Sequence, residues 1–233
     1  MPLRWSVLRW CCCLFSACNA PFIPNKQKGN LMNLNEILAR RVSAHHFAKG
    51  DIALSDIQSV ITQTLRTPTA FNLQNWHFSI VASEQGKEAL CQAAWGQGKV
   101  LEAAAVVVIS GDLQAYRKLA EKLRPDVDKG AVSAEMAQSW VEAARQNFEH
   151  NQQAKRDEAI RSASLAAMTL MLAVTEKGWA SCPMSGFDPE AVRRVCGLPE
   201  NFLPVLLVAL GLPDGSGQVQ KSRIGVDEVT QII

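Results

Sequence analysis

The stretch Thr67-Pro-Thr-Ala-Phe-Asn-Leu-Gln-Asn-Trp-His-Phe78 lies between a helical pattern and a strand-like one. Thr67-Pro68 ends the helix, because a proline ring disfavours the α conformation for the residue before it. The alternating segment His77–Val81 begins the strand. The loop between them carries amide and hydroxyl groups that suit a polar ring system, although the same residue types also fill ordinary loops. Helix, polar loop and strand in close succession indicate a chain that mixes both kinds of element.

Two helices are predicted before this stretch. Asn33 followed by Glu36 is a capping-box pattern for the first helix, which runs into the basic turn Arg40–Phe47. Ser55 is the expected cap of the second helix. Its apolar stripe at helical spacing consists of Ile57, Val60, Ile61 and Leu65.

Beyond the loop, Ser83 begins a third helix that Trp95-Gly-Gln-Gly98 ends. Val106–Ser110 is an unbroken apolar run, typical of a strand covered on both faces. The segment Leu113–Gln152 has a polar helical pattern, interrupted at Pro125, and is interpreted as a peripheral helical excursion that shapes the mouth of a site.

Ala159–Lys177 is apolar nearly all round, which predicts a helix buried in a core or against a partner subunit. A short strand, Trp179–Met184, follows it. Asp188 caps the next helix and Gly197 closes it. Pro204–Gly211 is a second covered strand. The predicted class is α+β, a central sheet with helices packed on it.

The chain has 233 residues, enough for one sizeable domain, with 48% hydrophobic and 20% charged residues and a formal charge of +2. So neutral a balance favours neither nucleic acid nor an anionic membrane surface as partner. Cys91, Cys182 and Cys196 are scattered, as expected for small buried residues in a reducing, cytoplasmic compartment, and they form no zinc-binding pattern.

Residues 1–31 form a separate segment in the predicted organisation, and 32–233 the domain. The first twenty residues contain a basic start, a short apolar run and small residues, which resembles a weak export signal. The alternative is an extension upstream of a natural start at Met32, because a fresh helical pattern opens directly after that methionine.

Basic and polar residues gather at three element ends. Arg41, Ser43 and His45 alternate in an extended turn, so their side chains point the same way and can converge on one anion. Lys221-Ser-Arg223 supplies two further cations, and Pro183–Gly186 is a turn whose glycine lets backbone approach a flat ligand. Each cluster also has an ordinary explanation, as a helix end, a solvated tail or a strand-to-helix turn.

No nucleophile triad is present, since no carboxylate has a reason to orient His45. Gly96-Gln-Gly98 follows a helix rather than a strand, so a dinucleotide-binding fingerprint is not supported. The residues therefore favour a phosphorylated, ring-bearing cofactor held by loops, which would itself supply the chemistry.

Four motifs in this order resemble the nitroreductase family of FMN-dependent NAD(P)H oxidoreductases, over about Met32 to Ile233. They are the basic turn Arg41–Phe47, the loop Pro68–Phe78, the turn Pro183–Asp188 and the late Lys221–Arg223. The resemblance implies a nitroreductase-like fold and an interlocked homodimer with FMN in its interface. It further implies ping-pong chemistry, in which NADH or NADPH gives hydride to flavin N5 and a nitroaromatic, quinone or similar acceptor then takes it.

The same resemblance implies roles for individual residues, none of them a catalytic side chain. Arg41, Ser43, Lys221 and Arg223 would hold the phosphate, and Val42 and His45 would lie beside the rest of the flavin. Ser185 and Gly186 would lie near N5, with Lys99 or Gln97 at the pyrimidine oxygen. The residues expected to come from the other subunit are Pro68, Thr69, Ala70 and Asn72.

Three positions depart from the family pattern. His45 replaces an arginine or lysine, which implies weaker or pH-dependent stabilisation of reduced flavin, because histidine titrates at about 6.5. Ser185 replaces a glutamate of some members, and Asn75 replaces a common proline. Two alternatives stay open: a flavin protein of this fold with non-reductase chemistry, and a dimeric module whose charged clusters are merely solvated.

Overall fold

One sheet of five strands, organised around β5, lies at the centre of the computed structural model, which describes residues 32–233. β5 pairs with β1, β3 and β4, and β3 pairs with β2; every one of these pairings is antiparallel. The strands are β1 (Phe47–Ala48), β2 (Trp76–Val81), β3 (Ala105–Asp112), β4 (Ala180–Met184) and β5 (Phe202–Pro213). The expected α+β class with a mostly antiparallel central sheet is confirmed, whereas the hypotheses about residues 1–31 lie outside the described residues.

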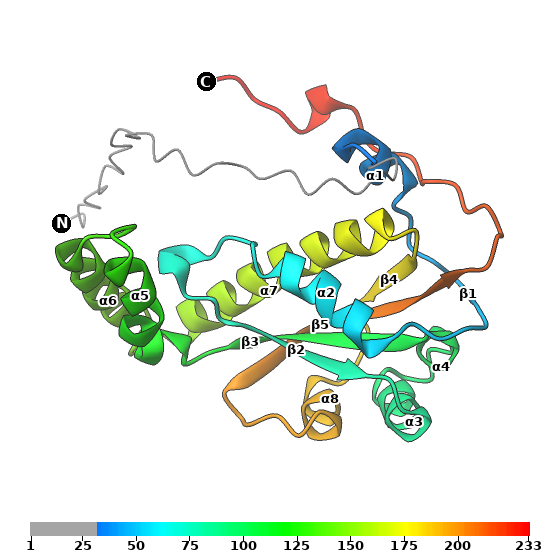
Figure 1. The fold of residues 1–233 in the computed structure, drawn as a ribbon, viewed down its shortest axis with the longest axis horizontal. Helices are drawn as coiled ribbons and strands as arrows, with labels where there is room; N and C mark the ends of the chain where they lie inside the picture. Colours follow the sequence, from blue (N-terminus) through cyan, green and yellow to red (C-terminus); the bar gives the residue numbers. More distant parts are fainter. Residues whose placement is uncertain (1–31) are drawn as a thin grey trace, which may run out of the picture. The chain divides into compact units, whose positions relative to one another are not determined.

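Helices cover both faces of the sheet (Figure 1). Val106 and Val108 of β3 point into a core shared with α3 and α8, and Val107 and Ile109 point into a core shared with α7 and α2. Residues 105–109 are all fully buried, which confirms the covered strand predicted from their apolar run.

The helices in chain order are α1 (Leu34–Arg40), α2 (Leu54–Thr64), α3 (Glu84–Ala93), α4 (Lys99–Glu102), α5 (Leu119–Asp128), α6 (Ala134–Phe148), α7 (Gln152–Glu176) and α8 (Pro189–Val195). Three short 3-10 turns accompany them: η1 (Ala70–Asn72), η2 (Ala115–Lys118) and η3 (Val226–Glu228). The predicted capping box of Asn33 and Glu36 is present, and the side chains of Ser83 and Asp188 cap α3 and α8 as expected.

Two details of the prediction were wrong. Ala53, not Ser55, is the N-cap of α2, and Ser55 lies inside the first turn, where it makes no capping bond. Pro125 does not interrupt a helix but lies within α5. Leu119 and Leu123 of α5 are buried while Pro125 is exposed, so packing on the inner side outweighs the hydrogen bond that proline cannot make on the solvent side.

α7 is the longest helix described and runs across one face of the sheet. It begins at Gln152, with Asn151 as its cap, seven residues before the apolar pattern at Ala159 that predicted it. By length and composition α7 could cross a membrane, but 61% of its apolar window is buried against the rest of the protein, as for a core helix. Its outer side exposes Ile160, Leu165 and Met168.

The α5–α6 hairpin forms a smaller core of its own at one end of the sheet (Figure 1). Leu119 and Leu123 pack there with Phe148 of α6 and with Leu73 from the loop after η1. The polar loop Pro68–Phe78 is therefore packed through Leu73 against the helical segment Leu113–Gln152.

Candidate functional site

A cavity of about 260 Å³ gathers the predicted basic residues at the end of α1. The backbone leaves the helix at Arg41 in an extended conformation (φ −64°, ψ 111°), so alternate side chains share one side. The C-terminal tail forms the opposite wall. The lining residues are Arg41, Val42, Ser43, His45, Gln218, Val219, Gln220, Lys221 and Arg223.

Two glutamines of the tail fix this arrangement. Gln220 donates to the carbonyl oxygens of Leu38 (3.0 Å) and Arg41 (3.3 Å). The amide of Gln218, oriented to satisfy both neighbours, donates to the carbonyl of Ser43 (2.7 Å) and accepts from the N–H of His45 (2.9 Å). These bonds hold the C-terminal tail against the basic turn, although the two segments are far apart in the sequence.

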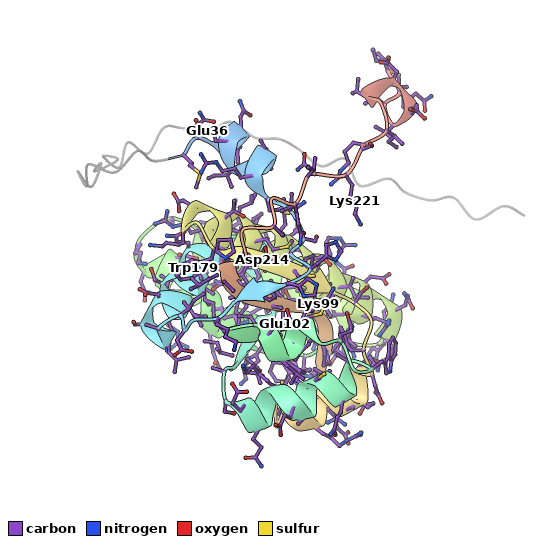
Figure 2. The ribbon with its side chains drawn as sticks, turned by 90° about the vertical axis from the view of Figure 1, so that its right-hand side faces the viewer. Glu36, Lys99, Glu102, Trp179, Asp214 and Lys221 are labelled. Atoms are coloured by element: carbon purple, nitrogen blue, oxygen red, sulfur yellow. The ribbon has the colours of Figure 1, made fainter. Side chains whose placement is uncertain are left out.

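The cations of the cavity are available to an anion. Among residues 32–233, Arg41, Lys221 and Arg223 take part in none of the ion pairs. Arg223 donates from Nη1 to the carbonyls of Lys221 and Ser222, which folds its side chain back along the tail. Figure 2 shows Lys221 on the extended tail, apart from Lys99 in the body of the protein.

A second, wider hollow of about 540 Å³ adjoins the cationic cavity and shares Arg41, Ser43 and Arg223 with it. Its wall away from the cations is apolar and contains Met168 and Met171 of α7 and Pro183 of β4. A cationic end beside an apolar wall suits a ligand that joins a phosphate to a ring system.

The other predicted residues of the body lie around the end of β4. Gln97 donates from Nε2 to the carbonyl of Gly186 (2.7 Å), and Lys99 Nζ lies 3.6 Å from Sγ of Cys182. Ser185, next to Gly186, is exposed. This group is tied to the basic turn because Ser181 of β4 accepts from the N–H of Ala44 (2.9 Å).

Trp95 is a neighbour of this group that sequence reasoning did not select. It adopts φ 55°, in the left-handed region, and is 71% exposed. Its ring lies 3.4 Å from the position that a Cβ on Gly186 would occupy. Gln218 and Gln220 were also missed, because only the path of the tail reveals their role.

The loop Pro68–Asn72 is not brought to these cavities. It lies beside α5 and α6, and Asn72 Nδ2 donates to Oδ2 of Asp126 (3.2 Å). Pro68 and Ala70 are exposed. The loop begins beside α7, where Thr67 Oγ1 donates to Oγ1 of Thr169 (2.9 Å), but Pro68–Asn72 line neither of the two cavities.

The fold and the cavities define an α+β protein with a cationic pocket beside an apolar hollow. The chain belongs to the nitroreductase family, whose sequence model matches residues 38–212. It is therefore an oxidoreductase, and FMN with NADH or NADPH is the cofactor set of its family.

Individual relatives agree with this assignment. The Bacillus subtilis protein named "Putative NAD(P)H nitroreductase MhqN" is 37% identical over 183 residues, which cover 78% of this chain and 89% of that protein. A Thermus thermophilus protein named "NADH dehydrogenase" is 33% identical over 76% of this chain and 85% of its own length. The crystal structure of Bacillus subtilis ydfN is 34% identical, has a TM-score of 0.80 and covers 85% of this chain and 98% of its own.

A nitroreductase from Exiguobacterium sibiricum, crystallised in complex with FMN, has a TM-score of 0.79 at 23% identity, over 87% of this chain and 98% of its own. At that identity the likeness concerns the fold alone.

Proposed function

We propose that the protein is an FMN-dependent NAD(P)H oxidoreductase that reduces nitroaromatics, quinones or related small acceptors by a ping-pong mechanism. The observation that carries this proposal is the cationic cavity of Arg41, Ser43, Lys221 and Arg223, which continues into the apolar hollow beside α7. The donor set fits the group: forked and ammonium cations with a hydroxyl suit a phosphate that carries nearly two negative charges.

Once bound, FMN would accept hydride from NADH or NADPH and pass it to the acceptor. The residues of the chain would position it. Arg41 and Arg223 would anchor the phosphate, Val42 and His45 would lie along the flavin, and Lys99 or Gln97 would offer a donor to the pyrimidine oxygen. Ser185 and Gly186 would present backbone and a small side chain near the reacting edge, with no protein acid or base required.

Pro68, Thr69, Ala70 and Asn72 would contact the flavin of a second subunit, because they line neither cavity of their own chain. The proposed partner is thus another copy of this chain. The exposed apolar side chains Leu165 and Met168 of α7 and Leu38 of α1 support this homodimer, since Met168 and Leu38 also line the hollow. Free, largely buried Cys91 and Cys182 are in keeping with a cytoplasmic location.

The test is to purify the full chain, record its spectrum, and titrate it with NADH and NADPH before adding nitroaromatics and quinones. We expect a yellow protein that bleaches with the nicotinamide and recovers its colour with an acceptor. A folded, colourless protein that does not bind added FMN would refute the proposal. If the protein binds FMN tightly but oxidises neither NADH nor NADPH in the presence of any acceptor, non-reductase flavin chemistry on the same fold would be favoured.

A further inference from the structure

The segment Phe71–Gln74, which includes the end of η1 and the start of the loop after it, has an unusual backbone. Phe71, Asn72 and Gln74 have φ values of 54°, 55° and 46°, so three of four consecutive non-glycine residues lie in the left-handed region. Such conformations persist only where the surroundings hold them, and they cluster at ligand clamps. One bond within the loop supports it, from the N–H of Gln74 to Oγ1 of Thr69 (2.9 Å), and further contacts come from outside the loop.

Those contacts come from α5 and α6. Lys122 donates from Nζ to the carbonyl oxygens of Leu73 (2.5 Å) and Gln74 (2.9 Å). Asp126, one turn further along, accepts from the side chain of Asn72 (3.2 Å). Phe71 meets Phe148 of α6 edge-on, with ring centroids 6.4 Å apart.

The ammonium of Lys122 makes its hydrogen bonds to this loop. Lys122 is half-buried, and in the part of the chain described here it joins none of the ion pairs. Burial lowers its pKa, although the charge of Asp112 acts in the opposite direction. A lysine that served only solubility would keep its ammonium in water, whereas Lys122 directs it to two backbone carbonyls.

We propose that Lys122 and Asp126 are positioning residues, which hold Thr69–Gln74 in the conformation that contacts the flavin of the partner subunit. This inference rests on the proposed function. It assigns to the α5–α6 hairpin the additional task of preparing a site in the other subunit, so that changes in the hairpin alter cofactor affinity without touching the cofactor.

The experiment compares four full-length variants with the original chain. Lys122→Met keeps the length of the side chain but removes its hydrogen-bond donors, whereas Lys122→Arg keeps a charged donor. Asp126→Ala removes the carboxylate that accepts from the side chain of Asn72. Lys118→Met is the matched control, because Lys118 is an exposed lysine at the N-cap of the same helix and makes no such bond. Each protein is stripped of flavin, and FMN affinity is measured by fluorescence quenching, alongside dimer mass, thermal midpoint and amide exchange of residues 69–75.

We expect Lys122→Met to weaken FMN binding at least about tenfold, since two bonds from a charged donor are lost. Amide exchange in the loop should accelerate, while dimer mass stays unchanged. The thermal midpoint of the flavin-free protein should fall less than for a fully buried lysine with two carbonyl acceptors, because Lys122 is only half-buried. Lys122→Arg should recover most of the affinity, Asp126→Ala should lose part of it, and Lys118→Met should match the original.

Unchanged FMN affinity in Lys122→Met would overturn the inference. So would a loss of affinity that only follows unfolding or dissociation, or one that Lys118→Met shares, because either would mean a general structural role. An original chain that binds no FMN at all would instead refute the proposed function on which the inference rests.

Discussion

The side chain of Gln97 donates a hydrogen bond to the carbonyl oxygen of Gly186, 2.7 Å away, and so joins the loop after α3 to the turn after β4. Replacing Gln97 with leucine removes the donor and leaves that carbonyl unpaired. Because a single such bond contributes about 1 kcal/mol, FMN affinity should fall about fivefold. Fluorescence titration measures the FMN affinity. The control is Gln92→Leu, at an exposed position on α3. Equal FMN affinities of the two variants would contradict the role of Gln97.

Arg41→Ala and Arg223→Ala should each lower FMN affinity by about 10- to 100-fold, since a charged hydrogen bond to phosphate contributes about 1.5–3 kcal/mol. The loss should shrink at high salt, which screens exposed charges. Arg40→Ala is the matched control, because Arg40 precedes Arg41 but does not line the cationic cavity. Titration in low and high salt tests this, and an Arg40→Ala loss as large as that of Arg41→Ala would argue against a phosphate site.

Leu165→Glu should abolish dimer and bound flavin together. Leu165 is 45% exposed on the outer side of α7, where a partner subunit would cover it, and burying a carboxylate there is costly. Size-exclusion chromatography with absorbance at the flavin bands reports both properties at once. A monomer that keeps its flavin would refute the shared site. Arg156→Glu, an exposed position on the same helix, is the control that shows whether a change of charge on α7 is enough to dissociate the dimer.

Lys87→Met should destabilise the fold by about 2–3 kcal/mol, because two backbone carbonyls lose a charged donor. Lys87 is buried, and its Nζ donates to the carbonyls of Leu101 (3.2 Å) and Ala103 (3.1 Å) while pairing with Glu84. Urea unfolding measures the change. Lys49→Met, at an exposed position, should be nearly neutral; equal midpoints for the two variants would disprove the role assigned to Lys87.

Burial raises the pKa of the Cys196 thiol above its ordinary value, partly offset by a bond with Ser79. Above about pH 9 the unfolded chain releases this proton while the folded protein retains it, so the free energy of unfolding should fall as pH rises. Cys196→Ala removes this contribution. Under reducing conditions, the stability of the original chain should therefore decline more steeply between pH 8 and about 10 than that of the variant, and parallel declines would exclude the effect.

The sheet could be predicted from sequence because Val106–Ile109 and Pro204–Gly211 are short runs without a polar residue, as expected for strands covered on both faces. The convergence of Arg41, Ser43 and His45 was likewise predictable from the alternation of an extended chain. Local rules suffice where a pattern repeats within one segment.

The rest depends on contacts between distant segments. Gln218 and Gln220 support the cavity only because the tail returns across α1, and nothing in their local sequence indicates that path. Phe71 and Gln74 adopt a backbone that their residue types disfavour, because Lys122 and the α5–α6 core hold them there. Pro125 stays helical for a similar reason, since tertiary packing outweighs local preference.

The position of β5 has a consequence for synthesis. This strand pairs with β1, β3 and β4, yet among the strands of residues 32–233 it is the last to leave the ribosome. Until Phe202–Pro213 emerges, one edge of β3 stays unpaired and β1 and β4 lack the strand they pair with, which makes the nascent chain prone to aggregation. Chaperone capture during translation, and poor solubility of fragments that stop before Phe202, are the expected costs of placing the central strand last.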